Sequence, residues 1–218
     1  MFFPYKDDNP RVLIPYVTYS LIAFNSFIFL YQFGMEFSDP EAAGIFIYAF
    51  GLIPADFSII TMFTSMFLHG GIAHILGNMW FLWIFGDNVE STLGHVKFVL
   101  FYLLCGVAAA LCQVLMNPGS EIPMVGASGA IAGVLGLYMI RFPRARVHVF
   151  IFILIFFTTI RVPANIVLGF WFFNQLTNGM GTLGLDTTGG VAWFAHIGGF
   201  IAGIILNQAF KLIQIKSM

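Results

Sequence analysis

The sequence predicts an all-α membrane protein, built as a bundle of six transmembrane helices that forms one domain over residues 1–218. Of the 218 residues, 59% are hydrophobic and only 9% are charged, which is far more apolar than a soluble domain. Long stretches without Asp, Glu, Lys or Arg also recur along the chain. Each is long enough to cross about 30 Å of hydrocarbon at about 1.5 Å per residue.

We expect the spans at about residues 12–34, 70–87, 98–116, 126–141, 162–179 and 191–211. The first should remain as an anchor, because the residues before it carry Lys6, two aspartates and two prolines and do not resemble a removable targeting peptide. Residues 35–69 should form an outer loop. Its apolar part, residues 42–55, is too short to cross and should lie at the interface or re-enter the membrane.

Between the fourth and fifth spans lies a second short apolar segment, residues 147–160, with Arg146 before it and Arg161 after it. A segment of this kind is expected at the cytoplasmic interface. Pro163 then suits the first turn of the fifth span, where a missing N–H costs little.

The basic residues predict the orientation. With six spans, all nine fall on one side of the membrane, which should be the cytoplasm: Lys6, Arg11, Lys97, Arg141, Arg144, Arg146, Arg161, Lys211 and Lys216. The opposite loops hold only acidic charges: Glu36, Asp39, Glu41, Asp56, Glu121 and Asp186. Both termini should therefore be cytoplasmic. A short chain without further domains favours the plasma membrane of a bacterium or archaeon.

Several classes of protein are excluded by composition. A net charge of −1 and the lack of a basic tract argue against a nucleic-acid-binding protein. Cys105 and Cys112, seven residues apart on one helix, are too far apart to form a disulfide. There is no His-Glu-x-x-His motif, and no Asp or Glu lies in the interior of a predicted span, so metalloprotease and aspartyl mechanisms lack their parts. We expect no metal and no other cofactor.

Polar residues inside the predicted spans indicate a site, because membrane helices rarely carry such groups without a function. His74 and Asn78 share one face near the start of the second span. Ser128 lies a few residues into the fourth span and His196 a few residues into the sixth. These three spans all start outside, so the four side chains should lie roughly 5 to 15 Å below the outer surface.

Small residues allow these helices to approach closely, because they form a stripe on each of two spans: Gly129, Gly133 and Gly136 on the fourth, and Gly199 and Gly203 on the sixth. The face of the sixth span that packs on the fourth also carries His196. Ser128 directly precedes its own stripe. This arrangement suits a nucleophilic serine and a general-base histidine held within hydrogen-bond reach by helices.

The start of the fourth span also predicts an oxyanion hole. The first N–H groups of a helix have no intrahelical partner and attract negative charge. The backbone at Ala127 and Ser128, with the side chains of His74 and Asn78, could therefore stabilise the oxyanion that forms during acyl transfer.

Each of these residues taken alone has a simpler explanation. Ser128 alone is better explained by helix packing, and His196 alone by packing or by haem ligation. His74 and Asn78 could form an interhelical hydrogen bond, while His69 is more simply an interfacial residue. The conjunction of all these groups at one depth favours catalysis.

Three motifs then resemble the rhomboid family: residues 74–78 (His-Ile-Leu-Gly-Asn), 126–129 (Gly-Ala-Ser-Gly) and 195–199 (Ala-His-Ile-Gly-Gly). The resemblance covers about residues 61–206. It implies a six-helix rhomboid-like bundle, a Ser–His dyad without a third acid, an outer loop dipping into the membrane, and a substrate gate between spans two and five. One departure is that many members carry Trp-Arg in the outer loop, where this chain reads Asp-Phe-Ser-Ile-Ile-Thr over residues 56–61.

The sequence therefore predicts an intramembrane serine endopeptidase that cleaves single-pass or polytopic membrane proteins near the outer face, through an acyl-enzyme. Its partners would be those substrates and the lipid bilayer, with no nucleic acid or metal. One alternative is a catalytically silent rhomboid-like protein that binds or chaperones membrane proteins. Another is a haem-binding electron carrier that uses His74 and His196.

Overall fold

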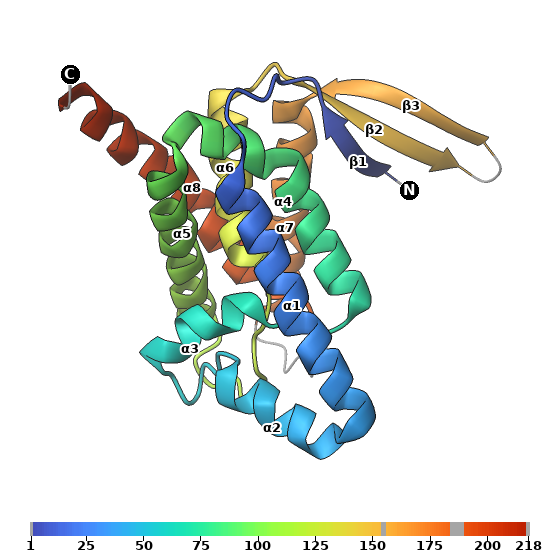
Figure 1. Cartoon of the computed structure of the whole chain (residues 1–218), viewed down its shortest axis with the longest axis vertical. Helices are drawn as coiled ribbons and strands as arrows, with labels where there is room; N and C mark the ends of the chain where they lie inside the picture. Colours follow the sequence, from blue (N-terminus) through green and yellow to red (C-terminus); the bar gives the residue numbers. More distant parts are fainter. Residues whose placement is uncertain (1, 154–155, 184–189, 217–218) are drawn as a thin grey trace.

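The bundle is made of long helices arranged around α6 (Figure 1). The computed structural model describes residues 2–153, 156–183 and 190–216, so Asp186 of the predicted outer loops lies outside the described residues. The long helices are α1 (Tyr16–Ser38), α4 (Ile72–Leu93), α5 (His95–Met116), α6 (Ser128–Arg141), α7 (Ala164–Thr182) and α8 (Trp193–Lys216). A helix thus occupies most of each predicted span.

The count of six spans stays a prediction. Within the described residues, two helices are long and apolar enough to cross a membrane, α5 and residues Trp193–Phe210 of α8. A third is added if residues Ile59–Phe67 and α4, which meet at a bend of 89°, are taken as one broken span. The 14 residues of α6 are too few for this test. That helix is buried from Gly129 to Tyr138, so its neighbours shield it.

The prediction of an all-α protein is wrong in one region. Strands β1 (Phe2–Asp7), β2 (Arg146–Ile153) and β3 (Phe156–Pro163) form an antiparallel sheet in the order β1-β2-β3. This sheet projects sideways from one end of the bundle (Figure 1). Its cause is a period-two pattern rich in β-branched residues, in which Val147 and Val149 are buried while Arg146 is exposed. The average hydropathy of the segment does not reveal this alternation.

The predicted outer loop, residues 35–69, is largely helical. It contains the end of α1, α2 (Pro40–Phe50), α3 (Ile59–Thr64) and the 3-10 turn η1 (Ser65–Phe67). Helix α2 begins with proline in its first turn, and the Asp39 carboxylate accepts a hydrogen bond from the Ala42 N–H at 3.0 Å. Leu52 and Met124 exchange backbone hydrogen bonds of 3.0 and 2.7 Å. These bonds tie the outer segment to the chain that leads into α6.

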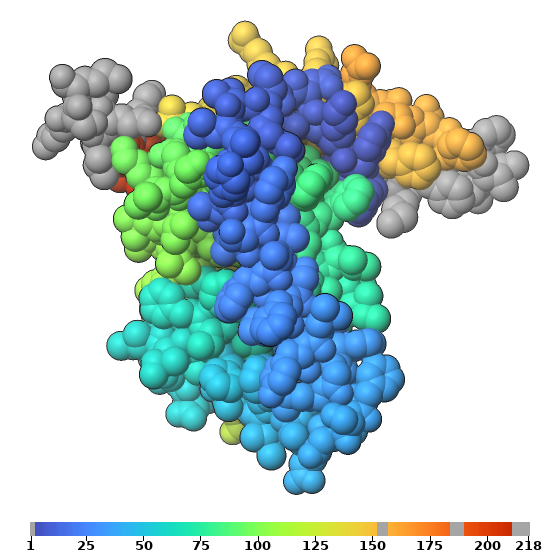
Figure 2. Space-filling model, in the orientation of Figure 1, coloured from blue at the N-terminus to red at the C-terminus, as the bar shows by residue number. Residues whose placement is uncertain are grey.

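The outer surface of the bundle is apolar, as expected for a membrane protein. Figure 2 shows α1 lying across one face of the molecule, down to the region of α2. On that helix Phe27 and Leu30 are each 67% exposed, and Phe173 on α7 is 59% exposed. Large apolar side chains on the outside of long helices are unfavourable in water but favourable in lipid. The protein is therefore an integral membrane protein.

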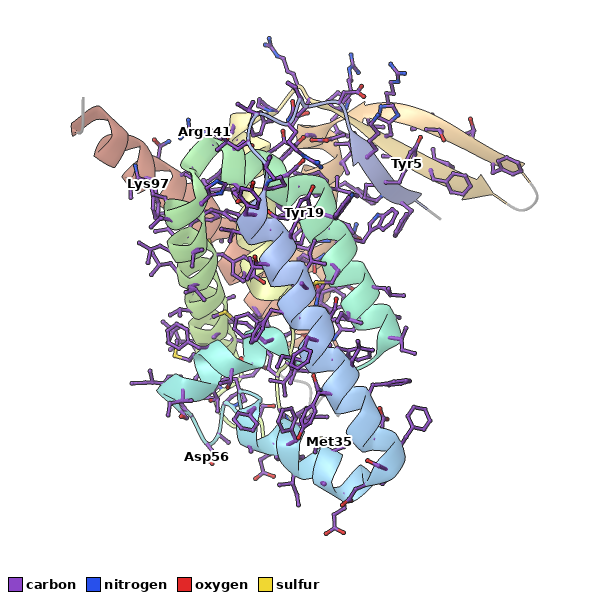
Figure 3. All side chains as sticks on the ribbon, viewed as in Figure 1. Tyr5, Tyr19, Met35, Asp56, Lys97 and Arg141 are labelled. Atoms are coloured by element: carbon purple, nitrogen blue, oxygen red, sulfur yellow. The ribbon has the colours of Figure 1, made fainter. Side chains whose placement is uncertain are left out.

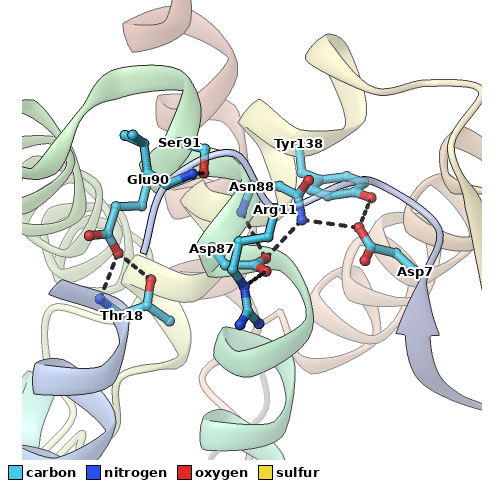
Figure 4. Close-up of polar contacts among 9 residues, drawn as sticks. Asp7, Arg11, Thr18, Asp87, Asn88, Glu90, Ser91 and Tyr138 are labelled. Carbon is cyan, nitrogen blue, oxygen red and sulfur yellow. Dashed lines mark hydrogen bonds and ion pairs between the residues drawn. The ribbon is translucent and has the colours of Figure 1, made fainter. Parts of the chain in front are cut away.

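A polar network closes the end of the bundle that carries the sheet (Figure 4). The fully buried Glu90 carboxylate accepts hydrogen bonds from the Val17 N–H at 2.9 Å and from the Thr18 N–H at 2.8 Å. It also accepts the Thr18 hydroxyl at 2.7 Å. Glu90 on α4 thus caps the start of α1, whose first N–H groups and dipole favour negative charge. Nearby, Arg11 forms an ion pair with Asp87 at 3.1 Å.

Asp7, at the end of β1, should make the attachment of this strand depend on pH. Its carboxylate accepts hydrogen bonds from the Tyr138 hydroxyl and, at 3.3 Å, from the Asn88 amide. Burial is the main cause that raises the pKa of Asp7 from its ordinary value of 3.8 to about 6, and Asp87 adds to it. A group whose pKa is raised on folding contributes stability below its unfolded pKa and loses that contribution as pH rises through the folded value.

We therefore expect the attachment of β1 to weaken as pH rises from about 4 to about 6, and to change little above that. Because part of the carboxyl remains exposed, the effect should be about 1 kcal/mol at most. The Asp7→Asn variant should lack this dependence, since an amide does not titrate. Limited proteolysis near the N-terminus at pH 4.5 and pH 7.5 measures the difference. Equal pH dependence in both proteins would contradict the role of Asp7.

Candidate active site

Ser128 is the first residue of α6, and its position is set by an unusual turn. Gly126 has φ +128°, a conformation that favours glycine, and its N–H donates to the Ser65 carbonyl at 2.8 Å. The helix then begins after Ala127, which has no side chain that could cap the first N–H groups. Ser128 itself is half-buried between two buried neighbours, Ala127 and Gly129. Its hydroxyl therefore stands at an uncapped helix start.

His74, from the first turn of α4, faces this turn. A Cβ atom at Gly126 would lie 2.7 Å from the Nε2 and Cε1 atoms of the His74 ring. The other ring nitrogen, Nδ1, accepts a hydrogen bond from the Gly70 N–H at 3.3 Å. A neutral imidazole that accepts at Nδ1 carries its proton on Nε2. His74 therefore directs an N–H donor at the turn before Ser128.

Asn78, one turn further along α4, directs a second donor at the same place. Its side chain is 7% exposed, and its amide nitrogen makes no hydrogen bond to any part of the chain that the structure describes. That nitrogen lies 3.6 Å from the position of a Cβ atom at Gly126. A buried donor without a partner costs about 1–3 kcal/mol. A ligand that accepts this hydrogen bond would remove the cost.

His196 lies in the first turn of α8. Its Nδ1 atom is 2.8 Å from the Oε1 atom of Gln175 on α7. Two indole rings lie beside the imidazole, Trp171 with its centroid at 5.8 Å and Trp193, edge-on, at 6.4 Å. Aromatic packing and one polar contact thus restrict the ring.

The two glycine stripes bring α6 and α8 into backbone contact. A Cβ atom at Gly199 would lie 2.0 Å from the Gly129 carbonyl oxygen, and one at Gly203 would lie 2.0 Å from the Gly133 oxygen. A Cβ atom at Gly129 would lie 3.7 Å from the oxygen of Ala195. The residue after Ser128 therefore packs against the residue before His196. Ser128 and His196 both lie within the described residues, and no hydrogen bond joins their side chains.

A small cavity lies beside Ser128 and is also lined by Gly126, Gly129, Ala192 and Ala195. Its volume of about 20 Å³ is enough for roughly one water molecule. Within the described ranges, no group of three or more His, Cys, Asp or Glu side chains is arranged to hold a metal ion.

Two neighbouring residues were not singled out from the sequence. Gln175 contacts His196, and Gln113 on α5 accepts the N–H of Ala195 at 3.2 Å with its side-chain oxygen. Both are polar residues in charge-free stretches, so the argument that selected the histidines and Asn78 could also have found them. His69 is only 2% exposed, and its ring centroid lies 5.2 Å from that of His74.

The chain is similar to proteins of one family. The family model for the Rhomboid domain matches residues 56–211. Over 153 residues, the chain is 34% identical to "Rhomboid protease GluP" of Bacillus subtilis (strain 168), with 69% of this chain and 26% of that protein covered. It is 30% identical over 157 residues to "Rhomboid protein 1, mitochondrial" of Saccharomyces cerevisiae, with coverage of 69% and 42%.

A third relative is "RHOMBOID-like protein 1" of Arabidopsis thaliana, 29% identical over 156 residues, with coverage of 69% and 34%. The chain thus spans less than half the length of these relatives. They come from a bacterium, a yeast and a plant, and one is named as mitochondrial. The comparisons therefore support an integral membrane protein without favouring the plasma membrane of a bacterium or archaeon.

Proposed function

The chain belongs to the rhomboid family, as its motifs predict, and we propose that it is an intramembrane serine endopeptidase with Ser128 as nucleophile and His196 as general base. We further propose that residues 1–218 form one membrane domain. Two contacts that join the residues before the matched segment to it support this, because β1 pairs with β2 and Glu90 caps α1.

One observation carries the proposal of catalysis. Two side-chain donors, His74 Nε2 and Asn78 Nδ2, both face the turn that precedes Ser128, and the Asn78 donor has no partner within the described structure. Pre-oriented donors beside a nucleophile are what the oxyanion of acyl transfer requires. A protein that only binds other membrane proteins needs neither donor.

The proposed reaction has two steps. His196 Nε2 takes the proton of the Ser128 hydroxyl, and the serine oxygen attacks a peptide carbonyl of the substrate. His74, Asn78 and the backbone at Ala127 and Ser128 stabilise the oxyanion. The tetrahedral intermediate breaks its C–N bond, and His196 returns the proton to the leaving amine. A water molecule then hydrolyses the acyl-enzyme by the same route, which restores Ser128.

The substrate would be a transmembrane segment of a single-pass or polytopic protein. An intact helix hides its carbonyl groups in hydrogen bonds, so we expect cleavage where small or helix-breaking residues allow local unwinding. We propose entry between α4 and α7. The packing supports this route, because α4 packs mainly on α1, α5 and α6, whereas α7 packs mainly on α8 and α6.

The charge distribution supports an orientation with cytoplasmic termini. Lys97 and Arg141 lie at one end of the bundle and Asp56 at the opposite end (Figure 3). Basic residues are retained on the cytoplasmic side. Since α6 runs from Ser128 to Arg141, the serine would lie toward the outer face.

Labelling with a fluorophosphonate tests the nucleophile. We expect the purified wild-type protein to be labelled in detergent, because the probe forms a covalent bond with an activated serine. The Ser128→Ala variant should lose at least about nine tenths of the signal. The Ser120→Ala variant, which changes a serine of the preceding loop, should label as wild type does. Equal labelling of wild type and Ser128→Ala would refute the assignment.

A further inference from the structure

A polar contact from α7 reaches Nδ1, one of the two ring nitrogens of the proposed base His196. Gln175 is 6% exposed, and its Oε1 atom lies 2.8 Å from Nδ1 of His196. A buried amide is costly unless its hydrogen bonds are made. This side chain is therefore held in place by specific partners.

The orientation of the Gln175 amide follows from its second partner. Its Nε2 atom donates to the Trp171 carbonyl oxygen at 3.1 Å. A flipped amide would bring two oxygens together there and lose that bond. The Oε1 atom must then face His196, and because an amide oxygen only accepts, His196 Nδ1 must be the donor. The neutral imidazole thus carries its proton on Nδ1, which leaves the Nε2 lone pair free.

From this geometry we propose that Gln175 is a positioning residue, which fixes the tautomer and ring plane of His196 so that Nε2 can accept the Ser128 proton. This inference rests on the proposed function. Gln175 holds the place that an aspartate holds in a Ser-His-Asp triad, but it is neutral. A neutral acceptor avoids the cost of burying a carboxylate among apolar helices. It orients the imidazole without compensating the charge that forms on it.

The hydrogen bond from Gln175 to the Trp171 carbonyl oxygen does not by itself explain why Gln175 is buried, as the neighbouring Asn174 shows. Asn174 makes the same kind of bond to the carbonyl four residues earlier, at 3.1 Å, yet it is only partly buried. What distinguishes Gln175 is its contact with His196. Asn174 is therefore a matched control on the same helix.

The test compares variants with and without an acceptor at position 175. We expect Gln175→Met and Gln175→Leu to lower kcat for a transmembrane substrate about 10- to 100-fold, with KM within twofold of wild type. Gln175→Glu keeps an acceptor oxygen and should recover kcat to within about fivefold. Asn174→Leu should behave as wild type. Thermal unfolding gives the fraction of each variant that is folded, and fluorophosphonate labelling gives the fraction with a reactive Ser128. Each kcat is calculated per active molecule.

Two results would overturn the inference. One is a kcat within twofold of wild type for Gln175→Met or Gln175→Leu. The other is an equal loss in the Met, Leu and Glu variants, which would indicate a packing role. Failure of the proposed function looks different, because then Ser128→Ala would leave cleavage and labelling unchanged whatever residue stands at position 175.

Discussion

Replacement of His196 by alanine should lower the rate of cleavage of a transmembrane substrate by about 10⁴- to 10⁶-fold, the range of losses when the base of a serine nucleophile is wrongly protonated or removed. The physical reason is that an un-ionised serine hydroxyl is a weak nucleophile, and no other imidazole is placed to accept its proton in the proposed mechanism. His74 is already committed, since its Nδ1 accepts from Gly70 and its Nε2 faces Gly126.

Reconstituted protein with a labelled substrate in vesicles gives this measurement. His148→Ala is the control, because His148 lies on β2 and contacts Asp8 at 2.6 Å, in the sheet at the other end of α6. That variant should cleave at the wild-type rate. If the wild-type protein binds substrates but cleaves none, the silent binding protein becomes the better explanation. If His196→Ala cleaves at the wild-type rate, His196 is not the general base.

The second large effect should come from Gly203→Ala. The added methyl group would meet the backbone oxygen of Gly133 at 2.0 Å, well inside van der Waals contact. Because that neighbour is backbone, it cannot rotate away, and α6 and α8 must separate. We expect a loss of several kcal/mol, enough to unfold much of the population in detergent, since overpacking of rigid contacts typically costs about 1–3 kcal/mol or more.

Gly169→Ala is the matched comparison, because it makes the same chemical change within α7. There, among the described residues, the new Cβ would have no atom within 4 Å apart from its chain neighbours and its own helix backbone. Replacing an interior helical glycine there should be neutral or stabilise by up to about 1 kcal/mol. The stability of both variants is measured by heating samples to a series of temperatures and determining the remaining folded protein by size-exclusion chromatography. Similar melting temperatures for the two variants would contradict the close packing of α6 on α8.

The helices could be predicted because lipid imposes a simple rule, namely that apolar segments satisfy their own backbone hydrogen bonds. The same rule failed to predict the sheet, because it considers only average hydropathy. Residues 147–153 are apolar on average, and what makes them a strand is the alternation of Arg146, Val147, His148 and Val149, together with pairing to residues at the start of the chain. Such distant pairing has no local signature.

The candidate site could be predicted because helix geometry fixes which residues share a face and a depth. Ser128, His196, His74 and Asn78 follow from spacing alone. The contacts that set the protonation of the two histidines cannot be predicted from spacing. The proton on His74 Nε2 depends on the Gly70 N–H, and the contact of Gln175 with His196 depends on how α7 packs beside α8. Neither relation is periodic in the sequence.

The pairing of β1 with β2 has a consequence for biosynthesis. Asp8 and His148, which meet at the base of this pair, are separated by 140 positions. At a translation rate of roughly 5–20 residues per second, the N-terminal segment emerges roughly 7 to 28 seconds before its partner is made. During that interval its backbone donors and acceptors are open to chaperones or to the lipid surface. Assembly of the sheet is thus a late event that follows synthesis of four of the long helices, α1, α4, α5 and α6.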